Sequence, residues 1–66
     1  METGIVNINT ASQQELESLP GIGPAYALRI IEHRSQAPFM QKEDIMKVKG
    51  IGQKTFDKLK DKISVD

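Results

Sequence analysis

The chain has 66 residues, no cysteine, and nine basic against nine acidic residues, so its formal net charge is zero. This length predicts one small domain whose single hydrophobic core is only marginally stabilising. The lack of cysteine excludes disulfides and thiolate zinc sites, and the balanced charge argues against a basic arm that coats nucleic acid indiscriminately. Stability must therefore come from the packing of helices.

Positive charge is unevenly distributed along the chain. Residues 1–35 contain two arginines against four acidic residues, whereas residues 36–66 contain seven lysines against five acidic residues. No apolar run approaches the roughly 18 residues that a membrane-spanning helix needs, and no signal-peptide pattern opens the chain. We therefore expect a soluble domain that does not span a membrane, either excised from a longer protein or a short stand-alone relative.

The chain begins with a predicted flexible lead-in over residues 1–5, and the first helix is predicted over about residues 11–19. A Thr-x-x-Gln capping pattern at residues 10–13 suits the start of this helix, and Ser-x-x-Glu at residues 12–15 is the competing register. One or two of the early apolar side chains are expected to pack against the body of the domain: Ile5, Val6 and Ile8.

The second helix is predicted over about residues 24–34. Its broad apolar face consists of Ala27, Leu28, Ile30 and Ile31. Pro38 breaks the helical pattern and makes residues 35–38 a connector. Phe39 and Met40, which follow the proline, are expected to be buried where the two halves of the chain meet.

The third and fourth helices are predicted over about residues 42–48 and 53–62. The inward-facing candidates recur at spacings of three and four residues, and they are Ile45, Met46 and Val48 in the third helix and Phe56, Leu59 and Ile63 in the fourth. The predicted fold class is therefore all-α, with four main helices at about residues 11–19, 24–34, 42–48 and 53–62.

The segment around the first turn is repeated around the second. Leu19-Pro20-Gly21-Ile22-Gly23-Pro24 returns 29 residues later as Val48-Lys49-Gly50-Ile51-Gly52-Gln53, and the flanking apolar positions repeat in the same register. The chain therefore contains two copies of one unit, over about residues 10–34 and 41–63, within a domain over residues 6–66. Neither copy can bury its apolar stripe alone, so we expect them to pack with a pseudo-twofold relation.

Each glycine pair is typical of a tight turn between two helices. The first glycine, Gly21 or Gly50, suits the left-handed conformation that ends a helix, because it has no Cβ. The second glycine stands where the next helix starts. Such an N-terminus exposes unpaired N–H groups and the positive end of the helix dipole, which together favour phosphate. The second turn is expected to bind more strongly, since Lys54 adds a charge there and Thr55 a hydroxyl.

Hydrophobic-x-Gly-Ile-Gly followed by a helix resembles the helix-hairpin-helix DNA-binding motif. Two copies, preceded by Val6-Asn7-Ile8-Asn9-Thr10-Ala11-Ser12 and ending in Lys62-Ile63-Ser64-Val65, resemble the C-terminal DNA-binding domain of ComEA-type competence proteins. The resemblance covers about residues 6–65. It implies a receptor that captures DNA for natural transformation at the extracytoplasmic face of the bacterial membrane, with DNA-uptake proteins as further partners.

The predicted function is sequence-independent binding of double-stranded DNA through its backbone phosphates. The predicted DNA-binding residues are Gly21, Ile22, Gly23, Ala25, Tyr26, Lys49, Gly50, Ile51, Gly52, Gln53, Lys54 and Thr55. Two alternatives are a protein–protein scaffold domain and a DNA-holding accessory domain of a repair enzyme.

Several side chains have an alternative interpretation. Tyr26 either contacts a sugar or phosphate or packs on the domain surface, and Lys47 and Lys49 are either phosphate ligands or ordinary surface charge. Arg29 aligns with Lys58, and this pair either reaches flanking phosphates or is solvated.

Catalysis is not expected of this chain. The single histidine, His33, is expected at the surface, because one histidine builds neither a zinc site nor a catalytic dyad. Glu43 and Asp44 suit the dipole at the start of the third helix rather than a metal pair. With no nucleophile or acid/base pair near the turns, we predict a protein that is not an enzyme and has no cofactor or metal.

Overall fold

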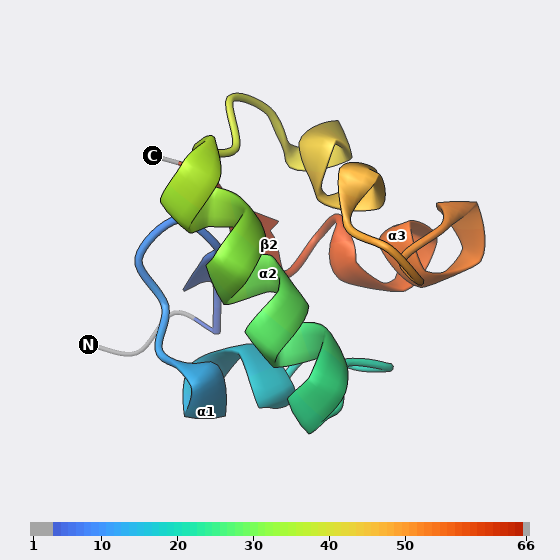
Figure 1. The fold of residues 1–66 in the computed structure, drawn as a ribbon. Helices are drawn as coiled ribbons and strands as arrows, with labels where there is room; N and C mark the ends of the chain where they lie inside the picture. The colour runs from blue at the N-terminus through green and yellow to red at the C-terminus, as the bar shows by residue number, and fades with distance from the viewer. Residues whose placement is uncertain (1–3, 66) are drawn as a thin grey trace.

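Short helices and one pair of very short strands follow one another along the chain in the computed structural model, which describes residues 4–65 (Figure 1). The elements are β1 (Val6–Asn7), α1 (Gln13–Glu17), α2 (Pro24–Gln36), the 3₁₀ helix η1 (Lys42–Lys47), α3 (Gln53–Leu59) and β2 (Ile63–Ser64). Helix α2 crosses the middle of the molecule, and α1 packs on one side of it (Figure 1). The architecture is mainly helical, as the sequence predicts.

The two strands join the beginning of the described chain to its end. They pair in parallel, with Val6 opposite Ile63 and Asn7 opposite Ser64. Val6 N–H donates to Lys62 O at 2.8 Å, and Ile8 N–H donates to Ser64 O at 3.0 Å. The sequence analysis missed these strands because two residues are too few to show an alternating pattern.

The first helix starts at the competing register of the capping pattern. Glu15 N–H donates to Ser12 Oγ at 3.2 Å, and Ser12 N–H donates to Glu15 Oε1 at 2.8 Å, which completes a capping box. The Thr10 register is wrong because the N–H groups of Thr10 and Ala11 are both bonded to Asn7 O, in a turn that follows β1. Helix α1 is therefore shorter than the predicted 11–19.

The other three helices also differ from their predicted bounds. Helix α2 continues two residues beyond the predicted end at residue 34, and stops where Ala37 adopts the extended conformation required before Pro38. The segment predicted as a helix over 42–48 is a 3₁₀ helix. Helix α3 ends at Leu59 instead of residue 62, because the chain must turn there to pair β2 with β1.

One core unites the two copies. Most of the predicted inward residues are buried, and with them Ile8 and the isoleucine of each glycine turn; the buried set is Ile8, Ala11, Leu16, Leu19, Ile22, Ala27, Ile30, Phe39, Ile45, Val48, Ile51, Phe56, Leu59 and Ile63. Val6, Ile31 and Met46 pack against this set while partly exposed.

Two predicted core residues are instead exposed. Leu28 is 53% exposed, because the covered face of α2 is narrower than predicted and is formed by Ala27 and Ile30. Met40 is 80% exposed, whereas the neighbouring Phe39 is 1% exposed. Phe39 enters the core, whereas the backbone of Met40 is bonded to Asp44 at the start of η1 and its side chain faces solvent.

The side chain of Asn9 connects three segments that are distant in sequence. Asn9 Nδ2 donates to Phe39 O at 2.9 Å and to Val65 O at 3.1 Å, while Asn9 Oδ1 accepts from Phe39 N–H at 2.8 Å. Nearby, Arg34 Nη1 donates to Ile8 O at 3.0 Å. These bonds hold the N-terminal segment, the connector and the end of β2 in one arrangement.

Asp44 fixes the start of η1. Its Oδ2 accepts from Met40 N–H at 2.9 Å and from Gln41 N–H at 3.3 Å, and its Oδ1 lies 3.5 Å from Lys47 Nζ. The hydrogen bond from Met40 is the largest of the influences that lower the pKa of this carboxyl group below its ordinary value; the bond from Gln41 and the charge of Lys47 act in the same direction, against the effect of burial.

The lowered pKa of Asp44 predicts a loss of stability in acid. Because the folded state favours the charged carboxylate, its contribution is fully present above the unfolded pKa and is lost as the pH falls through the folded value, below about pH 4. Urea unfolding of wild type and Asp44→Asn between pH 2.5 and 7 tests this. The free energy of unfolding of the variant should change less with pH, and parallel pH profiles would contradict the assignment.

No helix within residues 4–65 is long and apolar enough to cross a lipid bilayer.

Candidate nucleic-acid interface

Both glycine turns adopt the predicted left-handed conformation at their first glycine. Gly21 has a φ angle of 81° and Gly50 a φ angle of 95°, values that side-chain-bearing residues rarely adopt. In each turn, the residue after this glycine donates its N–H to the carbonyl three residues before it, at 3.1 Å in both cases. The two hairpins therefore have matching backbone structures.

Ile22 and Ile51 stabilise the hairpins from inside. Their side chains are buried in the common core, and their N–H groups are used in the bonds that close the turns. These two predicted DNA-binding residues thus hold the hairpins in shape, and they present neither a side chain nor a free N–H donor to a ligand.

The second glycine of each pair is the N-cap of the following helix. Gly23 has φ −94° and ψ −174°, Gly52 has φ −108° and ψ −165°, and neither helix start has a side-chain cap bond. A Cβ added at either position would meet nothing within 4 Å, so the space in front of each helix start is open. The N–H groups of residues 25–26 and 53–55 have no acceptor within their own helices and face this open space.

The side chains around the second hairpin are mostly exposed. Lys49, Gln53 and Lys54 are exposed, and Thr55 is partly buried. Gln53 Nε2 donates to Asp57 Oδ1 at 2.9 Å, which turns this side chain along α3. Lys54 lies in the first turn of α3, so its charge adds to the positive end of the helix dipole.

The first hairpin has no cationic side chain of its own. Pro24 occupies the first helical position of α2, and the exposed Ala25 follows it. Proline has no N–H, so this helix start offers one donor fewer than the start of α3. The sequence-based prediction that the second hairpin is the stronger phosphate site is consistent with this difference in exposed donors and charge.

The hairpins contact each other through equivalent positions of the two copies. A Cβ added at Gly50 would lie 2.6 Å from Tyr26 Cε1, so the Tyr26 ring rests directly on the second turn. A Cβ added at Gly21 would lie 3.7 Å from Thr55 Cγ2, so Thr55 faces the first turn. Tyr26 and Thr55 are aligned in the sequence repeat, and these contacts therefore follow the predicted pseudo-twofold relation.

The ring of Tyr26 is also covered by Arg29. The Arg29 guanidinium carbon lies 5.4 Å from the centre of the ring, and Arg29 Nη1 donates to Lys49 O at 3.1 Å. Of the two interpretations of Tyr26, the structure favours packing for the ring, while its N–H stays a predicted phosphate donor. The sequence repeat had aligned Arg29 with Lys58, but the bond from Arg29 to the second hairpin could not be found from that alignment.

His33 is less exposed than the sequence predicts. It is partly buried, and its ring stacks on Phe39 with centroids 4.9 Å apart and an interplanar angle of 12°. The reason is the burial of Phe39 in the connector, which brings its ring against the last turns of α2. In the described part of the chain, no three histidine or acidic side chains are grouped so as to hold a metal ion.

Two matched hairpins, each leading into a glycine-capped helix, define a tandem helix-hairpin-helix domain. The family model described as "Helix-hairpin-helix motif" matches residues 2–64, and the chain belongs to this family.

The relatives of this chain include proteins of several kinds. ComE operon protein 1 of Bacillus subtilis (strain 168) is 48% identical over 62 residues, which are 92% of this chain and 30% of that protein. DNA polymerase III PolC-type of Staphylococcus epidermidis is 48% identical over 42 residues, which are 64% of this chain and 3% of that protein. The human endonuclease/exonuclease/phosphatase family domain-containing protein 1 is 39% identical over 61 residues, 91% of this chain and 11% of that protein.

The chain thus spans less than a third of each of these relatives. The similarity to ComE operon protein 1 confirms the resemblance to ComEA-type competence proteins that the repeated turns indicate.

Proposed function

We propose that this domain binds double-stranded DNA without sequence preference, through backbone phosphates at its two hairpins. The observation that carries the proposal is the pair of helix starts at Gly23 and Gly52, which are open and without side-chain caps. Unpaired N–H groups at a helix N-terminus suit a phosphate oxygen. Such contacts fix a protein on the duplex and carry no base information, so binding is expected to be insensitive to sequence. The role is binding rather than catalysis.

The relatives support this proposal and suggest its biological setting. Membership of the helix-hairpin-helix family and the similarity to a PolC-type DNA polymerase support DNA binding in general. The 48% identity to ComE operon protein 1 supports a more specific role in a competence receptor that captures DNA, with DNA-uptake proteins as partners. This role belongs to a whole protein of which the chain matches 30%.

The affinity of the isolated domain is expected to be low. The chain has no net charge, and two hairpins contact only a few phosphates. Non-specific DNA binding is dominated by the release of counterions from neutralised phosphates, so we expect a dissociation constant in the micromolar range or weaker, about 10⁻⁶ M or above, with a modest salt slope. Several domains acting together would raise the effective affinity.

Replacement of Lys54 by glutamate is expected to abolish most of the DNA binding while the fold survives. The change reverses a charge in the first turn of α3, beside the open helix start, and should weaken binding at low salt by about tenfold or more. A glutamate in the first turn of a helix interacts favourably with the dipole, so the variant should not be destabilised. Fluorescence anisotropy of a labelled random-sequence duplex, titrated at several NaCl concentrations, measures the effect.

Lys62→Glu is the matched control for this experiment, since Lys62 is exposed and lies beyond the C-terminal end of α3. Equal weakening by both variants would mean that only net charge matters, and the hairpin proposal would fail. If wild type itself shows no binding at low salt and millimolar concentration, the DNA-binding function fails for this domain. The protein–protein scaffold function would then be the one to test.

A further inference from the structure

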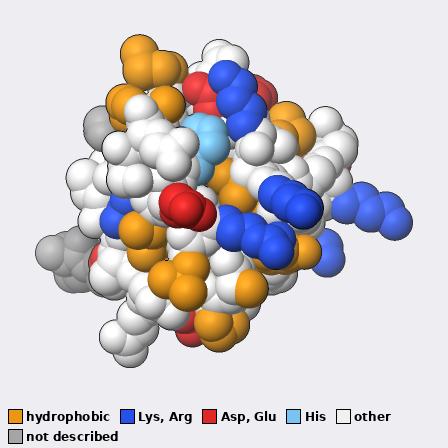
Figure 2. Space-filling model, viewed as in Figure 1, with side chains coloured by type: hydrophobic (Ala, Val, Ile, Leu, Met, Phe, Trp, Pro, Cys, Tyr) orange, Lys and Arg blue, Asp and Glu red, His pale blue; other side chains and the backbone are white. Residues whose placement is uncertain are grey.

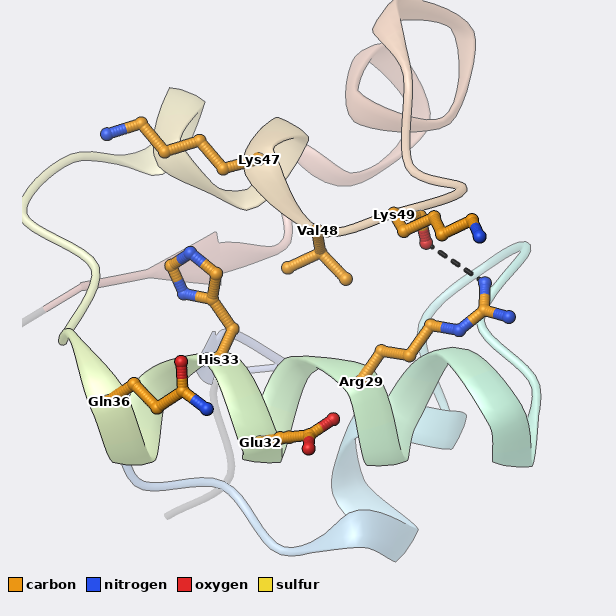
Figure 3. A pocket seen from close by; sticks show the side chains of 7 residues that line it. All are labelled: Arg29, Glu32, His33, Gln36, Lys47, Val48 and Lys49. Atoms are coloured by element: carbon orange, nitrogen blue, oxygen red, sulfur yellow. Dashed lines mark hydrogen bonds between the residues drawn. The ribbon is translucent and has the colours of Figure 1, made fainter.

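A groove separates α2 from η1 and the second hairpin (Figure 3). It has a volume of about 380 Å³, and neither the sequence repeat nor the hairpin site accounts for it. Arg29, Glu32 and His33 line it from α2, and Lys47 and Lys49 line it from the opposite side. Figure 2 shows that Lys and Arg side chains gather on this face beside the single histidine.

The groove is positively charged although the chain as a whole is neutral. Three cationic side chains, Arg29, Lys47 and Lys49, line it against the single carboxylate of Glu32. A recess lined by charges of one sign concentrates the field and attracts counter-ions. An anionic group is therefore the chemical class that this groove suits, and the proposed function supplies one in the backbone phosphates of DNA.

The cations of the groove keep hydrogen-bond donors for a ligand. Arg29 uses Nη1 to bind Lys49 O at 3.1 Å, which leaves most of the five guanidinium N–H donors available. The only ion pair of Lys47 within residues 4–65 is with Asp44, at 3.5 Å, and its side chain is 69% exposed. Lys49 is exposed beside the groove (Figure 3).

His33 lines the groove from α2 with a ring whose Nδ1 is buried. Its Nδ1 is shielded from solvent and has no hydrogen-bond partner among residues 4–65, although stacking on Phe39 fixes the ring. A buried polar atom without a partner is costly, and native structures rarely leave one. Because Nδ1 is shielded, His33 contributes to the groove as a fixed ring in its wall, and the ring signals report on a ligand held beside it.

We propose that this α2–η1 groove holds a further backbone phosphate of the bound DNA, next to the one at the second hairpin. The groove adjoins that hairpin, because Lys49 lines the groove and directly precedes Gly50. The hydrogen bond from Arg29 to Lys49 O also connects α2 to the second hairpin. A DNA strand that leaves the start of α3 therefore passes over the groove. The inference rests on the proposed DNA-binding function.

The first test is the removal of one groove cation. In the anisotropy titration, Lys47→Gln should weaken binding by between about 3- and 10-fold at low salt and reduce the salt slope by up to about one. Lys62→Gln removes the same charge at an exposed residue that does not line the groove, and it should change the affinity less than about twofold. Equal effects of the two variants would overturn the groove assignment.

The second test is a gain of affinity. Glu32→Gln removes the one carboxylate of the groove and should strengthen DNA binding by about 3-fold or more, because repulsion of the phosphate is relieved. Asp61→Asn removes an exposed acid that lies beyond the C-terminal end of α3 and does not line the groove, and it provides the control. A gain that is the same for both variants would again overturn the assignment.

Nuclear magnetic resonance identifies the ligand directly at His33. The ring signals of this single histidine should shift when the wild type is titrated with the duplex, and also in Gly21→Ala or Gly52→Ala if that variant still binds DNA. They should not shift when inorganic phosphate is added at the same phosphate concentration. Shifts with inorganic phosphate alone would replace DNA by free phosphate as the ligand. If Lys54→Glu abolishes DNA binding but the His33 signals of the wild type do not shift on titration with the duplex, the groove inference fails and the hairpin function stands. If the wild type does not bind the duplex, both fail.

Discussion

Replacement of Gly50 by alanine is expected to destabilise the domain more than any other glycine substitution in the hairpins. The added Cβ would lie 2.6 Å from Tyr26 Cε1 and 3.0 Å from Arg29 Nη1, and the φ angle of 95° is itself unfavourable for alanine. Strain and steric overlap together should lower the free energy of unfolding by about 2–4 kcal/mol. Urea unfolding followed by circular dichroism measures this value.

The other hairpin glycines provide matched controls. Gly21→Ala brings the same type of backbone strain, but its Cβ has only an ordinary contact at 3.7 Å, so we expect a loss of about 1–2 kcal/mol. Gly52→Ala, with a negative φ and open space, should cost less than about 1 kcal/mol. Equal losses at Gly50 and Gly21 would show that the contact with Tyr26 is unimportant.

A double-mutant cycle with Tyr26 separates the two causes. Tyr26→Ala removes the ring that the new Cβ would meet, so Gly50→Ala should cost less in this background than in wild type. The part of the loss that persists combines the backbone strain at the positive φ angle with the remaining contact with Arg29 Nη1. If Gly50→Ala costs the same in both backgrounds, the steric explanation is wrong.

Replacement of Asn9 by alanine is expected to be the most damaging polar substitution. The change removes two hydrogen bonds donated by Asn9 Nδ2 and one accepted by Oδ1, and it leaves the N–H of Phe39 without its partner. A buried polar group that is left without a partner costs more than the net contribution of one hydrogen bond. The three losses should therefore together lower the free energy of unfolding by about 2–4 kcal/mol. A domain of this size has only about 3–10 kcal/mol in total.

Thermal unfolding of Asn9→Ala should therefore show a midpoint lower by roughly 10 °C or more, since about 1 kcal/mol corresponds to 4–8 °C in a small domain. Gln14→Ala is a suitable control, because Gln14 is exposed on α1 and alanine is favourable in a helix. Asn9→Asp keeps the acceptor for Phe39 N–H but places a carboxylate oxygen against the carbonyl oxygens of Phe39 and Val65, so at neutral pH it should be at least as damaging as Asn9→Ala. A wild-type midpoint for Asn9→Ala would contradict the role of this side chain.

Most of the helical core was predictable from the sequence, because each copy carries its own apolar periodicity. Leu16, Ile30, Ile45 and Leu59 are buried as predicted. Apart from the exposed Leu28 on α2, the misses lie where segments from different parts of the chain meet: the paired strands, the bonds of Asn9 and the exposed side chain of Met40. Such long-range contacts leave no periodic signal in a single sequence.

The candidate site was predicted from the backbone properties of glycine and of helix N-termini. This prediction, too, could not include contacts between distant parts of the chain. Gly21 and Gly50 need positive φ angles, which a glycine repeat reveals directly, and both have them. The roles of the individual site residues in DNA binding stay predictions. The contact of Tyr26 with Gly50 and the α2–η1 groove could not be predicted, because both are formed between copies, and the repeat describes only what lies within one copy.

The parallel pairing of β1 with β2 has a mechanical consequence. The chain enters the first strand at one end of the pair and leaves the second strand at the opposite end. A force applied between the two ends of the domain therefore loads the bonds from Val6 to Lys62 and from Ser64 to Ile8 in shear, so that they must break together and not one after the other.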